Sequence, residues 1–439
     1  MLNRLDLRGA GTDLRAKLPR PAQATEGPVA VVKEILAAVK AGGDGAVGDL
    51  TERFDGVRPQ LRVDPADISA ALEAIEPELR AALESAALGI TDFHRTQVLD
   101  DHIYERDGIV VQGRKVPVDR AGCYVPGGRA IYPSTVLMTA IPARVAGVGE
   151  VVLCVPPDKT GRVPAPTLAA AAIAGVDEVY AVGGAQAIGA MAYGTETIRP
   201  VDVIVGPGNV FVAIAKREVA GLVGVPSSFP GPSEVVVIAD DSAPVELAAV
   251  DVILQAEHGP GGLAWLISWS EPALDAICAE IESQVAVAPR KDDIASTFAE
   301  GGYAVLCDSP EQAFAVSNLI APEHLEIITE DPQALVPLVR HAGAVFCGPW
   351  SPASVGDYMA GPSHVLPTDG TARFGSALTV SDFVKDVHVI TLDRESLVRA
   401  APVVASIADA EGLAAHADSV RRRVAWADRI DMATGSSKE

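Results

Sequence analysis

The segment Gln255-Ala256-Glu257-His258-Gly259-Pro260 places an amide oxygen and an imidazole three residues apart, directly before residues that stop a helix. Residues at positions i and i+3 share a helix face with Cβ atoms within ~6 Å, so Gln255 and His258 can hold one small group between them. Imidazole nitrogen and amide oxygen are workable ligands for a borderline metal such as zinc. Taken alone, the segment favours a simpler interpretation, in which His258 bonds the last free carbonyls of a helix.

A second candidate is Pro322-Glu323-His324-Leu325, where a carboxylate stands next to an imidazole at a predicted loop-to-strand junction. Neighbouring residues of a strand point to opposite faces, so Glu323 and His324 serve one pocket only if the chain bends there. Glutamate and histidine together supply two acid–base groups with different working ranges. The segment alone fits equally well a purely structural interpretation, in which Glu323 caps or pairs locally and His324 packs in the core.

Two further clusters follow towards the C-terminus. Asp357 and His364 lie seven residues apart in a glycine-rich stretch, where a carboxylate on a hinged loop suits a metal ligand but also commonly stabilises its own turn. Glu411 and His416 lie five residues apart near the start of the last predicted helix. That spacing is about 140° around a helix, so the two side chains diverge unless Glu411 sits in the first turn, where the helix dipole favours a carboxylate in any case.

Three glycine-marked turns are typical of sites where backbone approaches a nucleotide or phosphate. They are Tyr124-Val-Pro-Gly-Gly, Gly183-Gly-Ala-Gln186 and Gly206-Pro-Gly-Asn209. The last two precede predicted helices, whose free N–H groups favour anions. None has the GxGxxG pattern, so they indicate a nucleotide only weakly.

Strand–helix alternation must position these residues. One predicted series has strands at 150–155, 178–182 and 201–205, with helices at 165–174, 185–193 and 209–219. The other has strands at 234–239, 263–268, 303–307, 325–328 and 344–347, with helices at 244–257, 272–285, 312–319 and 332–341. Such alternation predicts an α/β fold with two mainly parallel sheets, and Glu150-Val-Val-Leu and Glu234-Val-Val-Val echo each other as if two halves were duplicated. Helices are also predicted at 29–41 and 67–91 and after residue 391.

Composition narrows the function classes. The chain has 439 residues and a net charge of -23 that is spread along the sequence, which disfavours nucleic acid and anionic lipid as partners. The first residues contain no apolar h-region, and the longest apolar run is about half of the ~20 residues that a bilayer span needs, so we expect a cytoplasmic protein. The five cysteines are scattered, which disfavours a disulfide framework and leaves Cys123 as the one candidate reactive thiol.

Taken together, the motifs resemble those of the histidinol dehydrogenase family over nearly the full length of the chain. Seven phrases appear in the family's order: Tyr124-Val-Pro-Gly-Gly, Ser134-Thr-Val-Leu-Met, Gly206-Pro-Gly-Asn, Gly231-Pro-Ser-Glu-Val, Gln255-Ala-Glu-His-Gly-Pro, Pro322-Glu-His-Leu and Gly356-Asp-Tyr. The resemblance implies an enzyme that uses one zinc ion per subunit and two NAD to oxidise L-histidinol through bound L-histidinaldehyde to L-histidine, in the last steps of histidine biosynthesis.

The resemblance also assigns roles to single residues. Zinc ligands would be Gln255, His258, Asp357 and His416, and the acid–base pair would be Glu323 and His324. Substrate would contact the four zinc ligands and His324, together with Ser233, His364 and Glu411. Tyr124, Gln186 and Asn209 would contact NAD. His416 and Glu411 would act in trans, from the neighbouring subunit of a homodimer.

The family fold implies two related, incomplete Rossmann-like domains with small terminal helical domains. We expect an N-terminal arm at 1–24, a first α/β domain at 25–119 and 236–377 with the metal and catalytic residues, a second α/β domain at 120–235 with the NAD site, and a C-terminal domain at 378–439 that reaches the partner. Two alternatives remain from sequence: a dehydrogenase of the same scaffold for another small alcohol, and a zinc hydrolase that needs no NAD.

Overall fold

The computed structural model describes residues 1–11, 13–19, 27–127, 130–226, 233–258 and 261–434. The chain forms two compact units, a larger one of residues 1–98 and 118–383 and a smaller one of residues 99–117 and 384–439.

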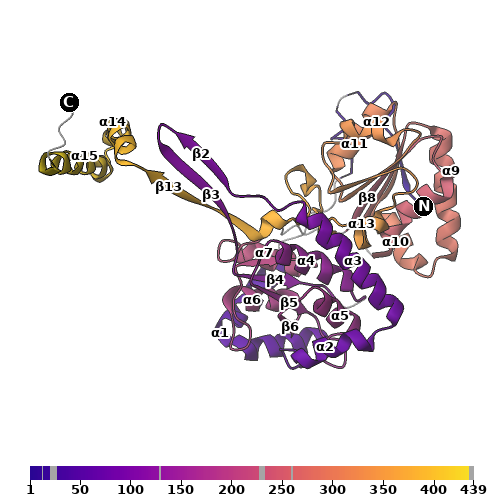
Figure 1. The fold of residues 1–439 in the computed structure, drawn as a ribbon. Coiled ribbons are helices and arrows are strands. Elements are labelled where there is room, and N and C mark those ends of the chain that lie inside the picture. Colours follow the sequence, from indigo (N-terminus) through magenta and orange to yellow (C-terminus); the bar gives the residue numbers. More distant parts are fainter. Residues whose placement is uncertain (12, 20–26, 128–129, 227–232, 259–260, 435–439) are drawn as a thin grey trace. The chain divides into compact units, whose positions relative to one another are not determined.

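A four-stranded parallel sheet occupies one part of the larger unit (Figure 1), with strand order β6-β5-β4-β7. Its strands are β4 (Arg120–Tyr124), β5 (Glu150–Val155), β6 (Glu178–Ala181) and β7 (Val203–Val205). The helices that pack around it are α1 (Gly27–Asp55), α2 (Pro65–Ala74), α3 (Pro77–Arg95), α4 (Pro133–Val145), α5 (Ala165–Ile173), α6 (Gly184–Tyr193) and α7 (Val210–Val219). One apolar core joins the sheet to α2–α5 and a second joins it to α1, α6 and α7.

A six-stranded parallel sheet forms the other part of the larger unit, with strand order β1-β10-β9-β8-β11-β12. Its strands are β1 (Asn3–Asp6), β8 (Glu234–Ala239), β9 (Leu263–Ser268), β10 (Gly302–Leu306), β11 (His324–Ile328) and β12 (Ala344–Cys347). Its helices are α8 (Val245–Leu254), α9 (Glu271–Val287), α10 (Lys291–Gly301), α11 (Pro310–Ile320), α12 (Pro332–Leu335) and α13 (Ala353–Tyr358). A short 3-10 helix at Ala256–His258 continues α8.

The smaller unit contains an antiparallel sheet of order β13-β3-β2 and two helices that pack on each other. Its elements are β2 (His102–Arg106), β3 (Ile109–Pro117), β13 (Val384–Leu392), α14 (Arg394–Ala410) and α15 (Ala414–Thr434). Strands β3 and β13 pair over nine residues. All five residues of β2 are exposed. Strand β2 therefore buries no face, and its sequence lacks the apolar pattern that marks a buried strand.

The predicted α/β class with two parallel sheets is confirmed, and most predicted elements lie within two residues of the observed ones. The sequence did not predict β2, β3, β4, β13, α4 or α10. The expected N-terminal arm contributes β1, which pairs with β10 at the edge of the six-stranded sheet. Helices α1–α3, expected to belong with residues 236–377, instead pack against the helices of the four-stranded sheet, because their apolar faces complete the two cores there.

Candidate active site

The carboxylate–imidazole pair lies at the amino ends of two neighbouring strands of the six-stranded sheet. His324 is the first residue of β11, and its register partner Val235 follows Glu234, the first residue of β8. The chain turns into β11 at Ala321, which takes the left-handed backbone conformation with φ 55°. Glu323 and His324 serve one site, as the acid–base interpretation requires, because Glu323 Oε2 lies 3.7 Å from His324 Nδ1.

Backbone groups hold Glu323 in place. Its side-chain Oε2 accepts a hydrogen bond of 3.0 Å from the N–H of Glu234. Its carbonyl accepts one of 2.9 Å from Ala344, and a Cβ at the adjacent Gly343 would lie only 2.6 Å from that carbonyl oxygen. Burial raises the pKa of Glu323 to about 7, although the nearby His324 acts in the opposite direction. A carboxyl group with this pKa can both accept and release a proton near neutral pH.

His324 lies among three polar neighbours. Its Nδ1 is 3.3 Å from the Gln255 amide nitrogen and 3.3 Å from the Glu234 carbonyl, two contacts that require opposite tautomers. Its Nε2 is 3.4 Å from Asp357 Oδ1. Burial lowers the pKa of His324, but the carboxylates of Glu323 and Asp357 outweigh it and the pKa is raised overall. When Nδ1 donates to the Glu234 carbonyl, Nε2 is the basic nitrogen.

Two of the predicted metal ligands flank His324. Gln255 is 1% exposed, and its Oε1 has no hydrogen-bond partner among the described residues. Asp357 lies on α13 with its carboxylate on the other side of the imidazole. A buried amide oxygen left without a donor costs free energy unless it has another partner, so this pair of oxygen ligands fits a cation.

The other two predicted metal ligands are His258 and His416. The side chain of His258 and residues Gly259 and Pro260 lie outside the described part of the chain. His416 is exposed on α15 of the smaller unit, as is Glu411 at the C-terminal end of α14. Within the described ranges, no group of three or more His, Cys, Asp or Glu side chains is arranged to hold a metal ion.

The predicted substrate residues His364 and Ser233 have well-defined backbone or side-chain partners. His364 Nδ1 donates to the Asp357 carbonyl at 2.9 Å, and its Nε2 accepts from the Thr135 hydroxyl at 3.0 Å. His364 therefore fixes the end of α13, next to Asp357. The Ser233 carbonyl accepts from Leu263 at 3.1 Å, while the rest of its motif, residues 231–232, lies outside the described part.

The three glycine-marked turns follow the carboxyl ends of β4, β6 and β7, where open parallel sheets bind ligands. The Tyr124 hydroxyl accepts from the N–H of Gly184 at 3.1 Å, which joins the first turn to the second. Gly206 (φ 105°) closes against the first strand, since a Cβ there would lie 2.0 Å from the Tyr124 carbonyl oxygen. Gln186 is buried in α6, and the Asn209 side chain caps α7 by accepting from Phe211 and Val212. The turn after β4 therefore contacts both the turn after β6 and the turn after β7.

Sequence reasoning missed several buried polar residues. Glu234 is 2% exposed at the start of an otherwise apolar strand, and burial together with the charge of Glu323 raises its pKa to about 8. Lys216 is buried and donates to the Gly206 carbonyl, and burial lowers its pKa to about 7. In both cases, the sequence feature that could have predicted a buried polar residue was a charged residue in or beside an apolar run. Cys123, expected to be the candidate reactive thiol, is fully buried with its pKa raised to about 12, which disfavours the reactive thiolate.

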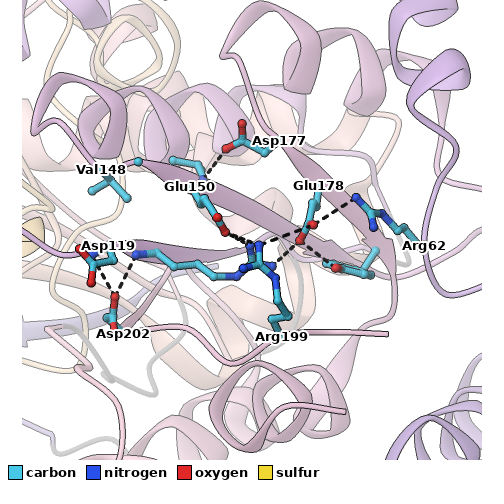
Figure 2. Close-up of polar contacts among 12 residues, drawn as sticks. Arg62, Asp119, Val148, Glu150, Asp177, Glu178, Arg199 and Asp202 are labelled. Carbon is cyan, nitrogen blue, oxygen red and sulfur yellow. Dashed lines mark hydrogen bonds and ion pairs between the residues drawn. The ribbon is translucent and has the colours of Figure 1, made fainter. Parts of the chain in front are cut away.

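A contrasting polar network occupies the amino edge of the four-stranded sheet (Figure 2). Arg120 is ion-paired with Glu150 and Glu178, the first residues of β5 and β6, which are the next two strands along the chain. Arg199 also pairs with Glu150, and Arg62 lies 3.1 Å from Glu178. The guanidinium groups lower the pKa of Glu150, and they outweigh burial to lower that of Glu178. These acids are held ionised, so the network is suited to stability and not to proton transfer.

The fold and site define the class of protein: a two-sheet α/β enzyme in which a buried glutamate–histidine pair adjoins oxygen-bearing side chains that suit a cation, with glycine-marked turns on a second sheet. The sequence model of the family described as Histidinol dehydrogenase matches residues 18–424. The chain belongs to this family of oxidoreductases.

Individual relatives agree with that assignment. The chain is 48% identical over 395 residues to histidinol dehydrogenase of Parasynechococcus marenigrum, covering 90% of each chain. It is 46% identical to that of Chlorobaculum tepidum, covering 94% of this chain and 96% of the relative. The crystal structure of histidinol dehydrogenase from Elizabethkingia anophelis is similar with a TM-score of 0.91 and 34% identity, covering 97% of this chain and 99% of that one. In the described part of this chain, no helix is both long and apolar enough to cross a membrane.

Proposed function

We propose that this chain is a zinc- and NAD-dependent histidinol dehydrogenase, which oxidises L-histidinol through L-histidinaldehyde to L-histidine with two NAD. The observation that carries the proposal is the buried Glu323–His324 pair beside the side-chain amide of Gln255, in a chain of this family. The pair supplies a base and a second acid–base group, and the amide oxygen supplies part of a metal site.

Gln255 and Asp357 would hold the zinc ion together with His258 and with His416 of a second subunit. The donor set of two oxygens and two imidazoles suits zinc, and the buried Gln255 Oε1, which accepts no hydrogen bond from the described residues, is available to coordinate a cation. When bound, zinc would fix the imidazole and amine of L-histidinol, and NAD would accept a hydride from the carbon placed beside it.

The protein's own residues would move the protons. His324 Nε2 would accept the proton of the alcohol in the first oxidation, and its raised pKa fits a group stabilised as imidazolium between two carboxylates. Glu323 would accept a proton from the water that attacks the aldehyde in the second oxidation. This role needs the carboxylate form, so the second step should accelerate as pH rises through about 7, the pKa of Glu323.

The remaining assignments complete the proposal. Tyr124, Gln186 and Asn209 would contact NAD from the connected turns of the four-stranded sheet. Ser233, His364 and the partner-borne Glu411 would orient the substrate. Residues 378–439 would reach the second subunit of a cytoplasmic homodimer, and the division of the larger unit into a catalytic and an NAD-binding domain stays a prediction.

The test is NADH formation by the purified protein with L-histidinol, before and after chelation. We expect two NADH per histidinol, loss of activity on chelation and recovery with zinc. NADH from a different small alcohol but not from histidinol would contradict the substrate assignment. Activity that survives complete metal removal would contradict the metal assignment.

A further inference from the structure

Two buried carboxyl groups outside the proposed catalytic pair share a hydrogen bond beneath it. Asp251 is 7% exposed and Glu326 is 1% exposed, and their side chains are hydrogen-bonded to each other. Ionised carboxylates are acceptors only, so this contact requires a proton between them. Burial first, then the charge of Asp251, raises the pKa of Glu326 to about 9, and burial raises that of Asp251.

The pair connects the three elements that carry the proposed site. Asp251 lies on α8 one helical turn before Gln255, and Glu326 lies on β11 two residues after His324, on the same strand face. Glu326 Oε1 also accepts a hydrogen bond of 3.2 Å from the N–H of Ala353, the first residue of α13. Asp357 follows four residues later on that short helix, so one acid pair is anchored to all three elements.

We propose that Asp251 and Glu326 form a proton-sharing positioning pair that fixes Gln255, His324 and Asp357 relative to one another and so sets the affinity of the site for zinc. The inference rests on the proposed zinc ligands. Stability alone does not require such a pair, because well-packed apolar residues in place of buried polar pairs are often neutral or stabilising. The pair instead specifies one arrangement of α8, β11 and α13.

The experiment compares two kinds of substitution. Glu326→Gln and Asp251→Asn keep a hydrogen bond without the shared proton, whereas Glu326→Met removes it at similar volume. Leu325→Met is the matched control, since it changes the neighbouring buried residue of the same strand without touching the carboxyl pair. Zinc affinity is measured with the metal alone against a competing chelator, and amide hydrogen exchange is measured over residues 353–358.

We expect Glu326→Met to weaken zinc binding by roughly tenfold or more, as loss of a supporting hydrogen bond does at other metal sites, and to speed exchange in α13. The Gln, Asn and Leu325→Met variants should stay within about threefold of wild type, and the KM for NAD should not change in any variant. If Glu326→Met does not fold, Asp251→Leu gives the same comparison.

Wild-type zinc affinity and exchange in Glu326→Met would overturn the inference. So would equal losses in the Gln and Met variants, because the hydrogen bond would then not be what matters, or a wild-type protein that binds no zinc. A wild type that binds zinc but does not oxidise histidinol would overturn the proposed substrate while leaving this test intact, so the two failures are distinguishable.

Discussion

Glu150 and Glu234 begin strands with nearly the same sequence, yet they behave oppositely. Glu150 starts β5 at the amino edge of the four-stranded sheet, lies half exposed and pairs with two guanidinium groups that lower its pKa. Glu234 starts β8 at the amino edge of the six-stranded sheet, is buried, and has its pKa raised to about 8. One edge neutralises its carboxylates with arginine, whereas at the other edge no arginine or lysine among the described residues pairs with Glu234 or Glu323. The difference teaches that a polar cluster becomes reactive when its charges are incompletely compensated.

The largest expected effect is on activity, and it should occur at the amino edge of the six-stranded sheet but not at that of the four-stranded sheet. Glu323→Gln should slow the conversion of histidinaldehyde to histidine by roughly a thousandfold, because the amide cannot accept a proton from water. Histidinol-dependent formation of the first NADH should persist in a single turnover. Glu150→Gln is the control and should keep both steps. Near-normal aldehyde oxidation by Glu323→Gln would exclude this residue as the base.

The Arg120 network should matter to stability and not to catalysis. Arg120→Met leaves two acids without their buried cation and should lower the free energy of unfolding by about 3 kcal/mol. Urea denaturation measures this change, with Arg199→Met, a loss of a half-exposed partner, expected to cost under about 1 kcal/mol. Activity per folded molecule should be unchanged. A large fall in kcat for folded Arg120→Met would break the comparison.

The pH dependence of stability should have opposite signs at the two edges. The pKa of Glu234 is raised, so its contribution to stability is present at low pH and is lost as pH rises through about 8. Glu234→Gln should therefore gain stability relative to wild type by about 4 kcal/mol between pH 5 and pH 9. The pKa of Glu150 is lowered, so Glu150→Gln should be destabilising at pH 8 and less so as pH falls towards 4. Parallel curves for the two variants would refute the assignment of the two edges.

The smallest expected effect tests whether the close packing of backbone around Glu323 is needed for activity. A Cβ at Gly343 would approach the Glu323 carbonyl oxygen to 2.6 Å, so Gly343→Ala should displace Glu323 and lower kcat by about tenfold, with little change in the KM for NAD. Gly45→Ala, where a Cβ would meet nothing within 4 Å, is the control and should leave kcat unchanged. Equal kcat values in the two variants would show that the close approach is not needed.

Much of the fold follows from local sequence. Apolar runs such as 150–155 and 234–239 predicted strands at their observed bounds, because a strand covered by helices on both faces must be apolar throughout. Strands β3 and β13 escaped prediction because they pair with each other across more than two hundred positions of sequence, and β2 escaped because all of its residues are exposed. The sequence also did not predict which sheet α1–α3 pack on, because an apolar helix face does not specify its partner.

For the candidate site, the sequence by itself determined the residue types and their motifs: Glu323 beside His324, Gln255 before a helix stop, and Asp357 on a glycine-rich stretch. Only the tertiary structure decided that these residues meet at the amino edge of one sheet and that Glu323 is buried enough for a pKa of about 7. It also decided that Glu150 and Glu234, in matching segments, have opposite ionisation behaviour. The physical reason is that a pKa depends on solvent and neighbouring charges, and those are supplied by segments distant in sequence.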